Sequence, residues 1–156
     1  MNKEKYYKKV WESIGFIVNL SQMIEYNIAN ILALNEIISA FDGEGSMFVF
    51  EYEVLLCKTD QWYKKLDKLE LGKVLREVQN KRIFTEDFIG CLDEIREERN
   101  YFVHSYFKDD LKTKEFQEDP KKIIPRLQNL VDKMHAANEE LVKIFAEMKQ
   151  EVKMIY

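Results

Sequence analysis

This chain of 156 residues lacks several features that mark secreted, metal-bound or membrane proteins. Its two cysteines, Cys57 and Cys91, are too few and too far apart in sequence to indicate a metal site or a disulfide framework. No apolar run reaches the length of a membrane span, and the residues after Met1 lead into no signal-peptide core. We therefore expect a cytoplasmic protein with no membrane partner, no metal and no cofactor, whose cysteines are small core residues.

A surplus of positive charge is also absent. Lysine and arginine together number 24 against 28 aspartates and glutamates, and the net charge at pH 7 is -4. Extended nucleic-acid-binding surfaces need lysine and arginine to release counterions from phosphates. Any affinity for RNA is therefore expected to be local or weak.

Hydrophobic residues in helical periods are what the chain does contain. They make up 46% of it, without internal repeats or low-complexity tracts, so we expect one domain over residues 1–156. The first helix is predicted from about Lys3 to Phe41, with a second row of side chains, Phe16, Leu20, Met23 and Asn27, beside its main seam. So broad a stripe indicates a central bundle helix or part of a dimer interface. The main seam consists of Val10, Ile14, Ile17, Ser21, Ile24, Ile28, Ile31, Asn35 and Ile38.

The next two helices are predicted between residues 47 and 80, after a glycine-containing turn at residues 42–46. Aromatic and β-branched residues from Met47 to Leu56 would suit a strand, but a helical period continues to Leu69 and favours a helix. A break at residues 70–72 precedes a short helix that ends near Asn80.

Two more helices complete the predicted fold. Thr85, followed by two acidic residues, is a plausible N-cap for the first. The last is predicted to end near Ile155, with Pro125 disrupting or kinking its beginning near Pro120, and the polar stretch at 108–119 before it is expected to be a loop or a frayed helical end. The predicted fold is therefore all-α, with four main helices and a short one.

Arg99 occupies an unusual position on the helix that opens after Thr85. It falls in the middle of the apolar face of that helix, where a guanidinium needs partners because it stays charged and loses its water. Arg99 is therefore expected to line a crevice or to face a partner chain. Alternatively, Glu94, Glu98 or a carboxylate of another helix holds it in a structural ion pair. The apolar face consists of Phe88, Leu92, Ile95, Phe102, Val103 and Tyr106.

Asn100 and His104 lie at the rim of the same face. At about 100° per residue, His104 is roughly 140° round the helix from Arg99, and Asn100 is one turn below His104. One helix cannot easily direct Arg99 and His104 onto one small target. Two copies of the helix, packed across a two-fold axis, could converge on a shared groove.

The pattern Arg99-Asn100-x-x-x-His104-x-Tyr106 resembles the Arg-x4-His signature of HEPN domains, and the tyrosine two residues after the histidine is similar to the toxin of HEPN/MNT toxin–antitoxin pairs. The Leu71-Gly72 turn that opens a helix ahead of this signature also resembles the HEPN pattern. The resemblance implies a HEPN-like bundle and a metal-independent endoribonuclease that cleaves single-stranded RNA in a composite homodimer groove. It further implies a toxin or defence effector, with a nucleotidyltransferase antitoxin as candidate partner.

The resemblance also implies roles for individual residues. Arg99 would grip the phosphate, His104 would act as base or acid, and Asn100 would orient either group. Tyr106 is the candidate modification site, which the nucleotidyltransferase would adenylylate. The alternative is a non-catalytic HEPN-like helical module that binds a nucleotide, RNA or a protein partner.

Other residues have plainer interpretations. Tyr106 would bury its ring in the apolar face and keep its hydroxyl at the rim. His135 lies off the apolar seam of the last helix and is interpreted as a surface residue. Tyr6, Tyr7 and Trp11 could stack on bases, but helix packing or dimer contact is the better interpretation.

Overall fold

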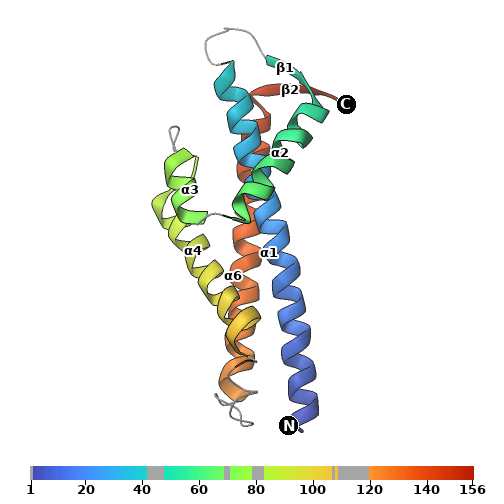
Figure 1. The fold of residues 1–156 in the computed structure, drawn as a ribbon, viewed down its shortest axis with the longest axis vertical. Coiled ribbons are helices and arrows are strands. Elements are labelled where there is room, and N and C mark those ends of the chain that lie inside the picture. Colours follow the sequence, from blue (N-terminus) through green and yellow to red (C-terminus); the bar gives the residue numbers. More distant parts are fainter. Residues whose placement is uncertain (1, 42–47, 69–70, 79–82, 107, 109–119) are drawn as a thin grey trace.

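The computed structural model describes residues 2–41, 48–68, 71–78, 83–106, 108 and 120–156, and Figure 1 shows the arrangement of its elements. These described elements confirm the all-α class, with four main helices and a short one beside a single two-stranded sheet. In chain order they are α1 (Lys3–Ala40), β1 (Phe48–Glu51), α2 (Tyr52–Leu66), α3 (Leu71–Val78), α4 (Glu86–Asn100), the π-helix η1 (Tyr101–Ser105), α6 (Pro120–Lys149) and β2 (Val152–Ile155).

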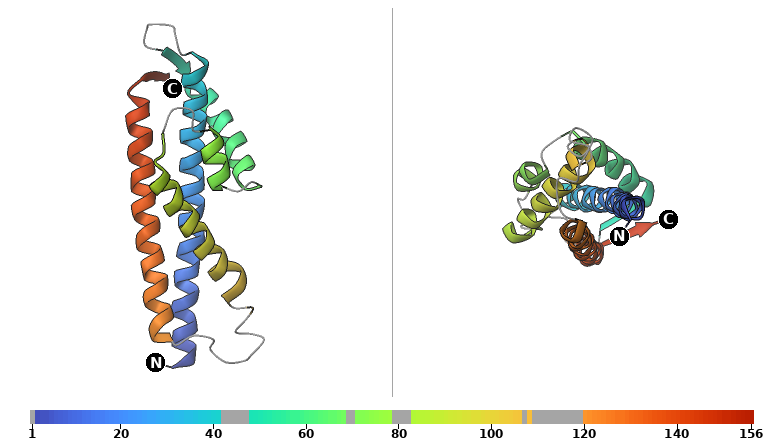
Figure 2. Two further views of the ribbon diagram at one scale, coloured as in Figure 1. Left: turned by 90° about the vertical axis from the view of Figure 1, so that its left-hand side faces the viewer. Right: turned by 90° about the horizontal axis from the view of Figure 1, so that it is seen from below.

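The two longest helices, α1 and α6, form the axis of the molecule. They run in the same direction along its length, while α4 crosses them and α2 lies against the far end of α1 (Figures 1 and 2). The predicted seam of α1 is largely buried, and Val10, Ile17 and Ile28 are fully enclosed. Between the two helices the Asn27 amide donates a hydrogen bond of 2.7 Å to the Asn138 side-chain oxygen. The packed pair of α1 and α6 forms the surface against which α4 lies.

A small parallel sheet corrects two helix predictions. Residues 48–51, predicted as helix, form β1, and the last helix ends at Lys149 instead of near Ile155, because residues 152–155 form β2. The register pairs Phe48 with Val152 and Glu51 with Ile155. The pairing places Phe50 and Val152 in a second hydrophobic cluster with residues of α1 and α2. A helical period read along one segment carries no information about such a partner strand.

Of the two alternatives at Pro125, a break before the last helix is wrong, since α6 begins at Pro120 and continues through Pro125. Proline has no backbone N–H, but at the first position of a helix this N–H would have no partner within the helix, so its absence costs little. Pro125 removes one further backbone bond near the helix start, where the buried side chains of Ile123 and Leu127 hold the turn in the core.

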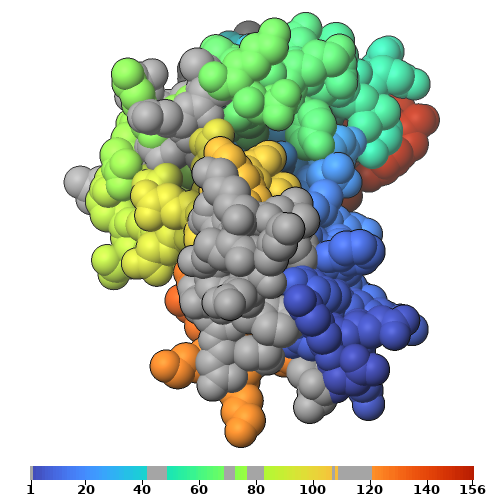
Figure 3. Space-filling model, turned by 60° about the horizontal axis from the view of Figure 1, so that its bottom comes forward, coloured from blue at the N-terminus to red at the C-terminus, as the bar shows by residue number. Residues whose placement is uncertain are grey.

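The first two thirds of α1 have an uncovered side. From Ala29 to Asn35 the helix is almost entirely buried, whereas before it a set of large apolar side chains is exposed. Figure 3 shows this part of α1 as an open surface on the side away from α3 and α4. Phe16 and Met23, predicted to widen a covered apolar face, are thus on the surface of the single chain. We call this set the outer face of α1: Trp11, Phe16, Val18, Met23 and Tyr26.

Some predictions concern residues outside the described ranges, namely the turn at 42–46 and most of the polar stretch at 108–119. Cys57 is exposed, so its interpretation as a core residue is wrong, whereas Cys91 is partly buried against the main core. His135 is exposed, as predicted. None of the helices in the described part of the chain combines the length and apolar character needed to cross a bilayer.

Candidate functional site

The helix that carries the predicted site begins at a well-formed cap. The Thr85 hydroxyl oxygen accepts a hydrogen bond of 3.1 Å from the backbone N–H of Phe88, and Glu86 and Asp87 follow in the first turn. Acidic side chains there complement the positive end of the helix dipole. The predicted N-cap is therefore confirmed, and buried Ile89, Leu92 and Ile95 orient the helix.

The predicted α-helix does not continue through the signature. After Asn100 the chain forms one π-helical turn, in which the N–H of Tyr106 donates to the carbonyl of Tyr101, five residues earlier. Such a turn is wider than an α-turn and advances by a smaller angle per residue. Arg99 and His104, which are five residues apart, therefore lie closer to one side of the helix than regular α-geometry implies. π-Turns are frequent at functional sites.

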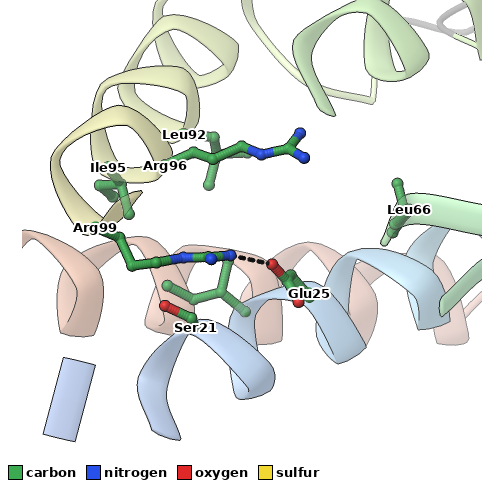
Figure 4. Close-up of a pocket in the computed structure, with 8 residues that line it drawn as sticks. Ser21, Glu25, Leu66, Leu92, Ile95, Arg96 and Arg99 are labelled. Carbon is green, nitrogen blue, oxygen red and sulfur yellow. Dashed lines mark hydrogen bonds and ion pairs between the residues drawn. The ribbon is translucent and has the colours of Figure 1, made fainter. Parts of the chain in front are cut away.

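Arg99 lies in a crevice between α4 and α1, in agreement with the first of its two predicted settings. Its Nη2 donates to Oε1 of Glu25 at 2.8 Å, and both side chains are partly buried (Figure 4). Sequence reasoning allowed for a carboxylate of another helix but did not identify Glu25. No sign of this partner is present in the sequence, because the pairing depends on the angle at which α4 crosses α1.

The crevice around Arg99 is small. The space that the centre of a water molecule can occupy in it is about 30 Å³, and the crevice is partly open to solvent. The lining includes a second arginine, Arg96, which extends over the crevice in Figure 4. Because the crevice is partly open, a strand of RNA would bind across its mouth. The lining residues are Ser21, Ile24, Glu25, Leu66, Leu92, Ile95, Arg96 and Arg99.

Asn100 and His104 are both exposed, so solvent and ligands can reach the amide and the imidazole. Within the described residues, no hydrogen bond or ion pair joins either side chain to Arg99. In the described part of the single chain, Arg99, Asn100 and His104 thus lie near the end of α4 without a hydrogen bond or ion pair that joins Arg99 to either of the others. A second copy or a bound strand would be needed to join Arg99 and His104 in one site.

Tyr106 differs from its predicted setting. Its side chain is fully buried, and its hydroxyl shares a hydrogen bond of 2.6 Å with the hydroxyl of Tyr6 on α1. The expectation that this hydroxyl stays at the rim is therefore wrong. Tyr6 packs inside the core, as one of its two interpretations held. Any chemistry on the Tyr106 oxygen requires its buried contact with Tyr6 to open.

Arg126 of α6 is a further residue of this region that sequence reasoning did not select. Its Nε donates to Oε1 of Glu98 at 2.6 Å, and its guanidinium carbon lies 4.9 Å from the ring centre of Tyr101 and 5.0 Å from that of Phe102. An arginine stacked on aromatic faces and paired with a carboxylate is held firmly. Arg126 therefore fastens the π-turn to α6, which fixes the backbone that carries His104.

The described residues contain no group of three or more histidine, cysteine, aspartate or glutamate side chains placed to hold a metal ion. Glu97 is exposed and Glu98 pairs with Arg126, so the two adjacent glutamates point to different surroundings. This arrangement suits solvated or structural charge better than paired acid–base chemistry.

Comparisons with models of protein families, with curated proteins and with solved structures give no match to this chain.

Proposed function

We propose that this chain is a metal-independent endoribonuclease of the HEPN type that cleaves single-stranded RNA in a groove shared by two copies. The observation that carries the proposal is the π-turn after Arg99. It places the exposed imidazole of His104 about one wide turn beyond the guanidinium of Arg99, which lines the crevice. In phosphodiester cleavage by an internal hydroxyl, an imidazole can transfer a proton and an arginine can stabilise the charge on the phosphate oxygens.

The reaction follows from the chemistry of these groups. A base removes the proton of the ribose 2′-hydroxyl, whose oxygen attacks the adjacent phosphorus, and the bond to the 5′-oxygen of the next nucleotide breaks. His104 serves as the base or as the acid that protonates the leaving oxygen. Arg99 stabilises the charge on the phosphate oxygens through parallel hydrogen bonds, and Asn100 orients the imidazole or the phosphate. The products carry a 2′,3′-cyclic phosphate and a 5′-hydroxyl.

The outer face of α1 supports assembly into a two-fold homodimer. Exposed apolar side chains can take part in association between chains, and Trp11 and Phe16 are each 64% exposed. Tyr26, at one end of this face, directly follows Glu25, the partner of Arg99. A second copy docked here would lie beside the crevice of the first, as a composite groove requires.

Cleavage in the presence of EDTA tests the proposal. The parent protein is expected to cut single-stranded RNA to cyclic-phosphate ends, whereas His104→Ala and Arg99→Ala are each expected to lose about 100-fold or more of the rate, the usual weight of a general acid–base or charge-stabilising group. His135→Ala and Arg76→Ala, which change the same residue types elsewhere, are matched controls. Equal cleavage by all five proteins would indicate a contaminating nuclease and would contradict the proposal.

Mixing variants tests whether the groove is composite. If each groove takes Arg99 from one copy and His104 from the other, an Arg99→Ala chain mixed with a His104→Ala chain forms heterodimers that keep one intact groove. Random pairing then restores up to about a quarter of the parent rate. No recovery after chain exchange would count against the shared groove.

A non-catalytic HEPN-like module that binds a nucleotide, RNA or a protein is the second candidate. The engagement of Arg99 by Glu25 favours it, because a paired arginine is a common structural device. RNA binding without cleavage by the parent protein would support this candidate.

The role of toxin or defence effector, and adenylylation by a nucleotidyltransferase antitoxin, belong to the same proposal. The buried position of Tyr106 makes the modification conditional on opening of its contact with Tyr6. Incubation with a nucleotidyltransferase and labelled ATP, with Tyr106→Phe as control, would test this step.

A further inference from the structure

The Glu25 carboxylate occupies one of the nitrogens through which Arg99 can bind an anion. Glu25 contacts one nitrogen of the guanidinium, Nη2, at 2.8 Å. An arginine can bind a phosphate through two nitrogens at once, with the same kind of charge-assisted hydrogen bond. The carboxylate and an RNA phosphate are therefore rivals for the same donor.

The groups around Arg99 make this position an anion site. Arg96 and Arg99, one turn apart on α4, are the two cations that line the crevice, and Glu25 is its one carboxylate. The hydroxyl of Ser21 already donates to the carbonyl of Ile17 at 2.8 Å, so its proton is not directed at a ligand. Attraction for an incoming anion must therefore come from the two arginines, and the charge of Glu25 opposes it.

The contact with Glu25 also obstructs a phosphate that would bind Arg99 through two nitrogens. Nη2 already donates to the carboxylate, so such a phosphodiester has to compete with Glu25 for this nitrogen. The Glu25 side chain is 27% exposed, and Arg99 is 21% exposed. A partly exposed side chain at the mouth of a crevice can turn toward solvent without unfolding the helix.

We propose that Glu25 is the resident anion of a phosphate site formed by Arg96 and Arg99, and that a phosphodiester of single-stranded RNA binds there by displacing the Glu25 carboxylate. This inference rests on the proposed function, because it names the residue that RNA must displace in that groove. Glu25 thereby lowers the affinity of the chain for RNA. The need to break a partly exposed ion pair of this kind is expected to weaken RNA binding about fivefold.

Binding measured without cleavage tests the inference. All proteins carry His104→Ala, and the probe is a fluorescently labelled 12-residue oligouridylate in EDTA, followed by anisotropy. Glu25→Gln, which removes the charge but retains the shape, is expected to lower the dissociation constant about fivefold. In an Arg99→Ala background the same substitution is expected to change it less than twofold. Glu12→Gln, an exposed glutamate of the same helix, is the matched control and is expected to change it less than twofold.

Each outcome decides the matter. Tightening that requires Arg99 supports the inference, and Glu25→Ser, which shortens the side chain, should reproduce it. Equal tightening with and without Arg99 would reveal a general charge effect, and weaker binding by Glu25→Gln would make Glu25 a positioning residue for Arg99. Either result overturns the inference while leaving the ribonuclease proposal intact. Absence of RNA binding by every variant overturns both.

Discussion

The phenolic oxygens of Tyr6 and Tyr106 lie 2.6 Å apart in the interior, where each ring is at most 1% exposed. This hydrogen bond joins the first turns of α1 to the residue directly after the π-turn. The two residues are 100 positions apart in sequence. The bond therefore fastens the end of the site-bearing helix to the beginning of the chain.

The hydrogen bond between Tyr6 and Tyr106 is expected to stabilise the folded chain. Tyr6→Phe or Tyr106→Phe removes this buried hydrogen bond, which is expected to lower the free energy of unfolding by about 1–3 kcal/mol. The double variant should lose less than the sum of the single losses, because neither oxygen then remains. Urea denaturation measures all three, with exposed Tyr26→Phe as control. Strictly additive losses would show that the two hydroxyls do not interact.

The cap of α4 is expected to contribute to the stability of the site. Thr85→Ala removes the side-chain oxygen that accepts from the Phe88 N–H, and a loss of about 1 kcal/mol in the free energy of unfolding is expected. Thr85→Ser keeps the oxygen and should retain most of that stability. Thermal or urea unfolding measures the difference. Equal losses in the two variants would mean that the methyl group of Thr85, and not its oxygen, is responsible.

The outer face of α1 is expected to control self-association. Trp11→Gln combined with Phe16→Gln should shift a dimer toward monomer, because the substitutions remove exposed apolar area without disturbing the core. Light scattering coupled to size exclusion, over a range of protein concentrations, measures the shift. Val142→Gln changes an exposed apolar residue of α6 and should leave the mass unchanged. A parent chain that remains monomeric at high concentration would contradict the assembly.

The ion pair of Glu36 predicts a loss of stability in acid. The hydrogen bond from Lys58 is the largest cause that holds the pKa of Glu36 below its ordinary value of 4.5; burial opposes this shift, and the hydrogen bond from Trp62 reinforces it. A lowered pKa means that the unfolded chain takes up the proton first, so the contribution is present above pH 4.5 and is lost as the pH falls through the folded-state pKa.

Glu36→Gln tests this pH dependence. The variant is expected to lose less than about 1 kcal/mol at neutral pH, since both partners are partly exposed. The stabilities of the two proteins should converge as the pH falls below the folded-state pKa of Glu36. Urea denaturation at pH 7 and in acid measures the difference, and a gap that persists unchanged in acid would exclude the ion pair as its cause.

Most of the helical framework was predictable because it depends on local periodicity. The spacing of Ile17, Ile24 and Ile28 predicted the buried side of α1, and Thr85 predicted the beginning of α4. The strand at 48–51 was missed, since its own residues also fit a helical period and its partner lies about 100 residues later. These residues form a strand because they pair with residues 152–155, and a short stretch of sequence does not contain this pairing.

The residues of the candidate site could be selected from the sequence, but their contact partners could not. The pattern around Arg99 and His104 selected the residues, and their chemistry follows from the residue types alone. Glu25 as the partner of Arg99 could not be predicted, nor could the meeting of Tyr6 with Tyr106, because both depend on the angle at which one helix crosses another.

The sequence by itself determined that this chain forms long amphipathic helices and that one of them carries a guanidinium, an amide and an imidazole near its end. Only the tertiary structure decided that the helix widens into a π-turn there, that the guanidinium is held by a carboxylate of α1, and that the following tyrosine is enclosed. Periodicity is a property of neighbours along the chain, whereas a crossing angle arises from the fit of side chains between helices, so only the former can be read from the order of residues.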